Sequence, residues 1–312
     1  MNLKNQTLEN WLYKARDREY NLGKKINYNA HYEKLKEWLM ANVHNEVTTG
    51  ANLQNQKELL NDHGPNHIDK VIEKASNLVD CKGCKLSPLE IYILLAAIQL
   101  HDVGNIYGRE GHEITLQEIM MKAGEACGRD EIERILIRKI AQAHGGKARG
   151  VRDVKDTIGQ LNPKEPLIDG EVSARAIASI LRFADELSDD KSRANTSLLK
   201  EGTLPKRSEV FHAYATCLES VLVKHDDRSV ELHFRIPKDF LIRKYGKLDS
   251  EVYLLDEIYE RVMKVHRERI YFMRYCRRLI ELDNILVYID FYSNLNPYLH
   301  SVAGCIIISS FK

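Results

Sequence analysis

The sequence has no hydrophobic run long enough to cross a bilayer. Its longest apolar runs, residues 91–100 and 285–289, fall well short of the roughly 20 residues that a membrane-spanning helix needs. The first five residues, Met-Asn-Leu-Lys-Asn, also lack the apolar stretch of a signal peptide. These two absences predict a protein that sits in no membrane and stays in the cytoplasm.

Cysteine is scarce, with six residues in a chain of 312. This number does not suggest a disulfide scaffold, which agrees with a reducing cytoplasm. Cys81 and Cys84 form one CxxC motif, but no second pair follows at the spacing of a zinc finger. We interpret them as two thiols in a surface loop.

An excess of charge of one sign is also missing, since the formal net charge is +1. This value argues against a broad electrostatic surface for duplex nucleic acid, although a local basic patch stays open. Hydrophobic residues make up 44% of the chain and charged residues 29%, which is typical of a globular protein. The length allows one large domain and a smaller one.

What the sequence does contain is an ordered set of potential metal ligands. Each lies at the end of a predicted helix or on its apolar face, where a buried carboxylate would cost several kcal/mol without a cation or donors nearby. Imidazole and carboxylate groups gathered at the edge of a core commonly hold a divalent metal. The set consists of His67, His101, Asp102, His112, His144 and Asp185.

Three segments indicate how helices carry these residues. Residues 87–90, Ser-Pro-Leu-Glu, predict a capping box, and the following run 91–100 is apolar all round, which is typical of a buried central helix. That helix ends at His101 and Asp102. Other helices are predicted to start near Pro65, near Asp130 and near Glu171, with inward positions at Ile68, Val71, Ile72, Ala75, Leu78, Ile132, Leu136, Ile137, Ile140, Ala141, Ala174, Ile177, Ala178, Leu181 and Ala184.

The pattern changes after about residue 210. Alternation over residues 230–236, with a turn at Asp226–Asp227, predicts a hairpin, and 285–291 and 305–309 predict two more strands. We expect a small antiparallel sheet of about four strands, one face of which is covered by a long helix over about residues 250–281. The residues expected on the covering face are Tyr253, Leu254, Ile258 and Val262.

The expected fold is therefore mainly α, with a smaller C-terminal α+β unit containing an antiparallel sheet. We divide the chain into an N-terminal helical extension that packs on the core (1–60), a helical metal-binding domain (61–210) and an accessory unit (211–312). The accessory unit shows no cluster of metal ligands. It is expected either to shape substrate access, to bind a protein partner or second protomer, or simply to buttress the helical domain.

The ordered ligands resemble the HD superfamily of metal-dependent phosphohydrolases over about residues 60–195. That pattern has a histidine, a His-Asp doublet and a distal aspartate on different helices, matched here by His67, His101–Asp102 and Asp185. His112 and His144 match the additional histidines of binuclear members. The segments around 62–67, 86–104 and 183–185 are similar to the HD-CE branch, whose domains often occur beside heat-shock-ATPase-like modules in prokaryotic conflict systems. This resemblance implies an HD-domain helical bundle and a role in antiviral defence.

Two departures narrow the substrate. Asn105 stands where signalling phosphodiesterases of the superfamily often carry lysine, and the Gly-Tyr-Pro tripeptide of cyclic-di-nucleotide phosphodiesterases is missing. Both argue against a cyclic dinucleotide. Neither affects the metal site.

The ligand set suits one or two ions of manganese, iron, cobalt, nickel, zinc or magnesium. His67, His101, Asp102 and Asp185 would form the first site, and Asp102 could bridge to a second, since a carboxylate has two oxygens. His112 and His144 would help form that second site, so Asp102, His112 and His144 are the expected catalytic residues. His63 has either a supporting role or a role in the turn before the helix.

The sequence favours a metal-dependent phosphohydrolase that acts on a phosphate ester through a metal-activated water, with a nucleotide as the expected substrate. Candidate phosphate-binding cations are Arg109, Lys147 and Arg193, although ordinary surface charge would also explain each. Two alternatives stay open. One is a regulatory or nucleotide-sensing module that acts through a partner protein, and the other is a single-strand nuclease, which the near-zero charge disfavours.

Overall fold

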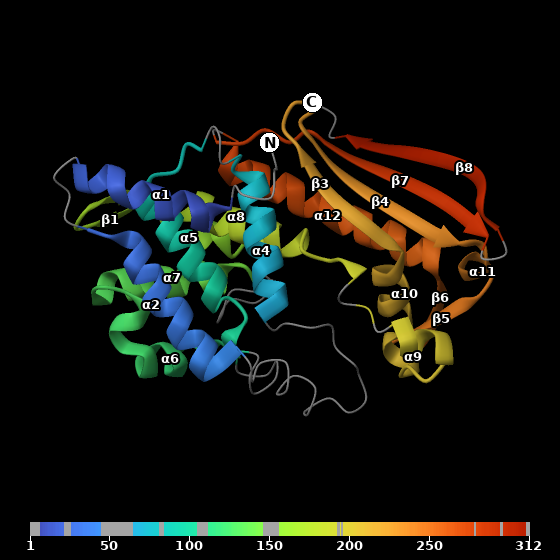
Figure 1. The fold of residues 1–312 in the computed structure, drawn as a ribbon, viewed down its shortest axis with the longest axis horizontal. Coiled ribbons are helices and arrows are strands. Elements are labelled where there is room, and N and C mark those ends of the chain that lie inside the picture. The colour runs from blue at the N-terminus through green and yellow to red at the C-terminus, as the bar shows by residue number, and fades with distance from the viewer. Residues whose placement is uncertain are drawn as a thin grey trace. The chain divides into compact units, whose positions relative to one another are not determined.

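The computed structural model describes ten stretches of the chain, which form two compact units (Figure 1). The first unit comprises Met1–Gln54, His63–Asp185 and Arg274–Ile280, and the second comprises Asn55–Asp62, Glu186–Met273 and Glu281–Lys312. The predicted division at residues 60 and 210 stays a prediction. The described residues are 7–21, 26–44, 65–80, 84–104, 112–145, 156–191, 194, 196–277, 279–293 and 296–309.

The first unit is a helical bundle with one short hairpin. Its longer helices are α1 (Leu8–Asn21), α2 (Tyr28–Leu39), α4 (Pro65–Leu78), α5 (Pro88–Leu100), α6 (His112–Ala123), α7 (Glu131–Ala143) and α8 (Ala174–Glu186). A π-helical turn (Met40–His44) extends α2. One 3-10 turn (Gly124–Cys127) follows α6, and another (Ile158–Gln160) precedes the hairpin. The hairpin pairs β1 (Glu165–Leu167) with β2 (Gly170–Val172) in antiparallel fashion.

Helix α5 is the central helix of this unit, as the sequence predicts. Every residue from Leu89 to Leu100 is buried. The capping box is present, because Ser87 Oγ accepts from the Glu90 backbone N–H at 3.2 Å and Glu90 Oε2 accepts from the Ser87 N–H at 3.0 Å. The other carboxylate oxygen of Glu90 accepts from the Ser173 N–H at 3.0 Å, which joins the start of α5 to the start of α8.

The helices that start at Pro65 and after Asp130 are confirmed. Asp130 caps α7 by accepting from the Glu133 N–H at 2.9 Å. Two details of the prediction are wrong. Ile132 is 64% exposed, because the buried face of α7 runs through Glu133, Leu136, Ile137 and Ile140. Helix α8 begins at Ala174 and not at Glu171, because Glu171 pairs with Pro166 in the hairpin.

The N-terminal helices α1 and α2 contact the buried helices of the same unit through both apolar and polar groups. Leu8 and Leu35 are fully buried. The Leu8 N–H donates to Ser76 Oγ of α4 at 3.0 Å. The Tyr32 hydroxyl donates to Glu9 Oε1 at 2.6 Å and accepts from Gln99 Nε2 at 2.9 Å.

The second unit contains the strands that the sequence predicts. Its main sheet has the order β3-β4-β7-β8, formed by Leu218–Lys224, Ser229–Pro237, Asn284–Ser293 and Asn296–Ser309. The hairpin between β3 and β4 turns at residues 225–228, and Val230, Leu232, Phe234 and Ile236 are buried as the alternation predicts. Three helices precede or follow these first strands: α9 (Thr196–Glu201), α10 (Glu209–Cys217) and α11 (Lys238–Leu241).

The sheet is mixed rather than wholly antiparallel. Its pairs β3–β4 and β7–β8 are antiparallel, but β4 and β7 are parallel. The reason is the connection between them, which includes the long helix α12 (Leu254–Cys276). A helical crossover brings the chain back to the same end of the sheet, so the next strand runs in the same direction.

Helix α12 is shorter than predicted. Residues 250–253 form strand β6 (Ser250–Tyr253), which pairs with β5 (Lys244–Lys247), so the helix starts only at Leu254. Leu254, Ile258 and Val262 are buried as expected, whereas Tyr253 is 44% exposed. Among the described residues, no helix is long and apolar enough to cross a membrane.

Candidate metal centre

Four of the predicted ligands meet at the ends of three helices of the first unit. His67 lies in the first turn of α4, His101 and Asp102 follow the last residue of α5, and Asp185 lies in the last turn of α8. Each of these helices is held by a buried apolar face. Packing of those faces therefore delivers the polar helix ends to one place.

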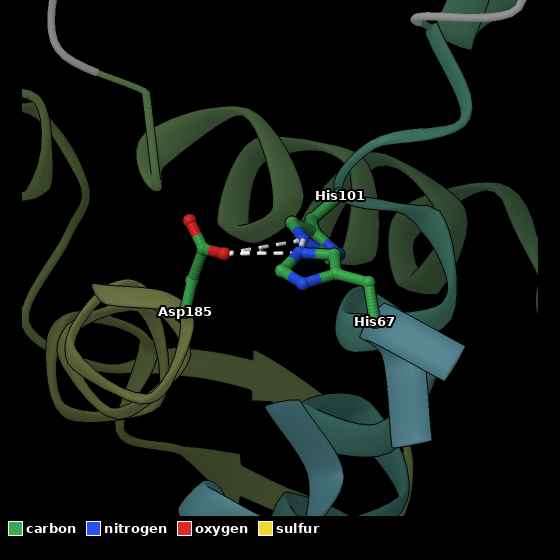
Figure 2. A group of neighbouring side chains, drawn as sticks. All are labelled: His67, His101 and Asp185. Atoms are coloured by element: carbon green, nitrogen blue, oxygen red, sulfur yellow. Dashed lines mark hydrogen bonds and ion pairs between the residues drawn. The ribbon is translucent and has the colours of Figure 1, made fainter. Parts of the chain in front are cut away.

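The side chains of His67, His101 and Asp185 form a compact group (Figure 2). Their ligand atoms all lie within 4.8 Å of one another, and Figure 2 shows the Asp185 carboxylate pointing toward both rings. His67 Nε2 lies 3.1 Å from Asp185 Oδ1 and 3.3 Å from His101 Nε2. Atoms bonded to one ion at about 2.1 Å lie roughly 3.0–3.5 Å apart. These two separations fit a shared ion, whereas the third, between His101 Nε2 and Asp185 Oδ1, is longer at 3.8 Å.

Asp102 presents its two oxygens to different histidines. Oδ2 lies 3.5 Å from His67 Nε2 and 3.4 Å from His101 Nε2, while Oδ1 lies 3.8 Å from His144 Nε2. His144 caps the end of α7, and its ring meets that of His101 edge-on, with 5.0 Å between centroids. The structure therefore places His144 beside the Oδ1 atom of Asp102, and His67 and His101 beside its Oδ2 atom.

Backbone carbonyls fix the tautomers of two of the histidines. The Nδ1 atom of His101 lies 2.7 Å from the Ile98 carbonyl oxygen, and that of His144 contacts the Ala141 carbonyl oxygen. A carbonyl only accepts, so Nδ1 carries the proton in each ring and donates it. In the neutral ring, each Nε2 atom then presents a lone pair to the cluster, which is the arrangement that metal-binding histidines need.

Solvent reaches the cluster from the carboxylate side. The side chains of His67 and His101 are 2% and 0% exposed, whereas that of Asp185 is 31% exposed. Asp102 and His144 are each 14% exposed. Among the described residues, the rings of His67 and His101 are therefore closed to water, and the Asp185 carboxylate is the most exposed group of the cluster.

The carboxylates and imidazoles of the cluster shift one another's pKa values. Burial disfavours the charged ring of His101, but Asp102 and Asp185 outweigh it and raise its pKa to about 9. Burial also disfavours the charged form of Asp185, yet hydrogen bonds from His101 and His67 hold its pKa well below the usual range. Burial and the neighbouring His101 lower the pKa of His144. The two partly buried carboxylates thus favour positive charge in the cluster, and the Nε2 atoms of His101 and His144 can bind a metal ion when their rings are neutral.

The side chains of the other predicted site residues lie outside the described part of the structure. His112 begins α6, but its side chain is outside the described part of the structure. His63, Asn105, Arg109, Lys147 and Arg193 also lie outside the described residues, as does Cys81.

Two residues near the cluster were not identified from the sequence. Arg182, on α8, donates from Nη1 to Gly145 O and to Thr157 Oγ1, both at 3.2 Å. Thr157 is buried and donates to Ala143 O at 2.7 Å. The one available signal was that Arg182 precedes Asp185 by less than one helical turn.

Comparison with known families agrees with this geometry. The HD-CE family model matches residues 57–262, more than half of the chain. The chain belongs to the HD-CE family. All six ligand-type residues of the sequence analysis lie within the matched range, as the resemblance to HD-type domains predicts. No curated protein and no solved structure matches the chain.

Proposed function

We propose that this HD-CE chain is a metal-dependent phosphohydrolase that acts on a phosphate ester, with a nucleotide as the preferred substrate class. The observation that carries the proposal is Asp102, whose two oxygens face different histidines across a partly open cluster. Family membership favours an HD-type hydrolase. When bound, a divalent metal would polarise a phosphoryl oxygen and lower the pKa of a coordinated water.

The residues of the cluster have separate tasks in this proposal. His67, His101 and Asp185 would hold the first ion, because their ligand atoms converge and Nδ1 of His101 is already committed to a carbonyl. Imidazole nitrogens beside carboxylates suit manganese, iron, cobalt, nickel and zinc, whereas an all-oxygen set would favour magnesium. The buried rings of His67 and His101 would keep bulk water away from that side.

Asp102 and His144 would connect this first site to a second. The two oxygens of Asp102 allow it to bridge, and Nε2 of His144 faces the second oxygen. His112 completes this second site in our proposal, and Asp102, His112 and His144 are the residues assigned to catalysis. Binding of the phosphate group itself is assigned to Arg109, Lys147 and Arg193.

A regulatory function is the second candidate. The second unit has its own mixed sheet and, within its described residues, no group of three ligand-type side chains. A unit whose described residues hold no such group could instead bind a partner protein or a second copy of the chain. In that case the metal cluster would sense a nucleotide rather than hydrolyse it.

Metal analysis combined with a nucleotide hydrolysis screen tests the proposal. The purified chain should contain a transition metal and release phosphate or a nucleoside from at least one nucleotide. Asp102→Asn should abolish the activity, whereas the same change at Asp227, an exposed residue of the β3–β4 turn, should not. Stoichiometric metal without hydrolysis of any nucleotide would give the regulatory function the lead, and absence of metal after reconstitution would contradict both.

A further inference from the structure

The backbone carbonyl groups at the end of α7 accept hydrogen bonds from both backbone and side-chain donors. The last carbonyls of a helix have no partner within the helix, and those around His144 are close to the metal cluster. The Ala141 carbonyl accepts from His144 itself, and the Gln142 carbonyl accepts from the Gly145 N–H at 3.2 Å. The next carbonyls, of Ala143 and Gly145, accept from side chains of other segments. His144 therefore sits within a turn that is fixed on both sides.

Thr157 and Arg182 supply these two side-chain donors as one connected pair. A hydroxyl carries one proton, and Thr157 Oγ1 lies closer to Ala143 O (2.7 Å) than to Gly145 O (3.1 Å). Thr157 thus donates to Ala143 and accepts from Arg182 Nη1 at 3.2 Å. The same Nη1 atom lies 3.2 Å from Gly145 O. The guanidinium is charged, which strengthens its bond to the carbonyls at the negative end of α7.

Arg182 also belongs to the helix that carries Asp185. The two residues are separated by three positions on α8, so they lie on neighbouring parts of one face. The helix that supplies Asp185 is therefore hydrogen-bonded directly to the turn that supplies His144. This connection affects the position of His144, whose Nε2 atom lies 3.8 Å from Asp102 Oδ1.

We propose that Arg182 and Thr157 are positioning residues, which set the distance between His144 and Asp102 by holding the end of α7 against α8. The inference rests on the proposed function, since it assumes that His144 is a metal ligand. It assigns neither residue a contact with substrate. Loss of the pair should displace His144 while leaving His67, His101 and Asp185 in place. His67 and His101 belong to α4 and α5, and α8, which carries Asp185, is held by its own buried apolar residues.

The structure offers a matched control on the same helix. Arg175 of α8 also donates to backbone carbonyls, from Nε to Leu161 O at 2.8 Å and from Nη2 to Gly159 O at 3.0 Å. Its acceptors lie outside the turn that carries His144. Arg175→Met therefore removes the same kind of interaction while keeping both side-chain donors to the turn that carries His144.

Titration of the metal-stripped full-length chain with cobalt(II), followed by visible absorption, tests the inference without any substrate. Arg182→Met and Thr157→Val should weaken cobalt binding by about 10–100-fold, the range for residues that orient metal ligands. Thr157→Ser keeps the hydroxyl and should bind cobalt as the parent does. Arg175→Met should do the same. Parent-like affinity in Thr157→Val, or an equal loss in Arg175→Met, would overturn the assignment.

The decisive comparison places Arg182→Met in a His144→Ala background. If the arginine acts through His144, its replacement should weaken cobalt binding no further once His144 is gone. The same fold-loss in both backgrounds would mean that Arg182 acts on the fold alone and would overturn the inference, as would parent-like cobalt affinity in His144→Ala. If Arg182→Met does not fold, Thr157→Val takes its place in the same comparison, with and without His144→Ala. Failure of nucleotide hydrolysis would remove the proposed function without altering this result.

Discussion

The Nε2 atom of His67, in the first turn of α4, lies 3.1 Å from the Oδ1 atom of Asp185, in the last turn of α8. The two residues come from distant parts of the sequence, and both belong to helices whose opposite faces are buried. A histidine and a carboxylate brought together in this way would form only a hydrogen bond in an ordinary core. Here His101 and Asp102 join them from a third helix, and the group acquires the donors of a metal site.

Replacement of the doublet should abolish activity without unfolding the chain. Asp102→Ala and His101→Ala should each lower kcat/KM by more than about 100-fold, because each removes a first ligand rather than an orienting group. Circular dichroism should stay that of the parent, since both residues lie beyond the end of α5. Activity that survives Asp102→Ala, or that is indifferent to a chelator, would refute the mechanism.

The metal-free chain should lose stability as the pH rises above neutrality. The pKa of His101 is raised to about 9, so its protonated form stabilises the fold fully below the unfolded value of about 6.5, and this contribution disappears as the pH passes 9. The pKa of Asp185 is lowered from its ordinary value of 3.8, so its contribution to stability is present above that value and is lost on acidification. Thermal unfolding in chelator should therefore show a falling Tm between about pH 6.5 and 9. A Tm that rises across this window would contradict the assignment of charge.

Removal of the capping box should destabilise the first unit. Ser87→Ala removes the acceptor of the Glu90 N–H, and the loss of such a cap typically costs about 1 kcal/mol. Urea unfolding of the metal-free chain measures the change. An unchanged midpoint would show that the hydrogen bond from Ser173 to Glu90 holds the start of α5 by itself.

Arg269 should contribute little to stability despite its burial. It is 2% exposed on the buried stripe of α12, and Nη1 donates to Leu282 O at 2.6 Å. Its Nε and Nη2 atoms contact no acceptor among the described residues, and burial lowers its pKa. Since unpaired buried donors cost about 1–3 kcal/mol, Arg269→Met should leave the free energy of unfolding unchanged or raise it. A loss above about 3 kcal/mol would indicate an interaction that the structure does not contain.

Much of the fold follows from local patterns in the sequence. The run 91–100 is apolar all round, so its burial at the centre is determined by composition alone. His101, Asp102 and Asp185 were identifiable because each continues an apolar face with a charged or titratable group. Alternation over 230–236 likewise predicts the second strand of the hairpin correctly.

Other features depend on tertiary contacts that no local pattern reveals. The parallel pairing of β4 with β7 depends on where α12 returns the chain. Residues 250–253 have a pattern compatible with either a strand or a helix start, and pairing with β5 decides between them. The bond from Arg182 to Gly145 joins two segments through a side chain that looks like ordinary surface charge in the sequence.

Anomalous scattering from crystals grown with excess manganese would test the central claim most directly. We expect one ion bonded to His67, His101, Asp102 and Asp185 at about 2.0–2.2 Å, and a second ion on the Oδ1 side of Asp102 near His144. A single ion would contradict the assignment of His144 and leave the first site intact. No ion at the cluster, or any two of the four ligands more than about 8 Å apart, would contradict the account as a whole.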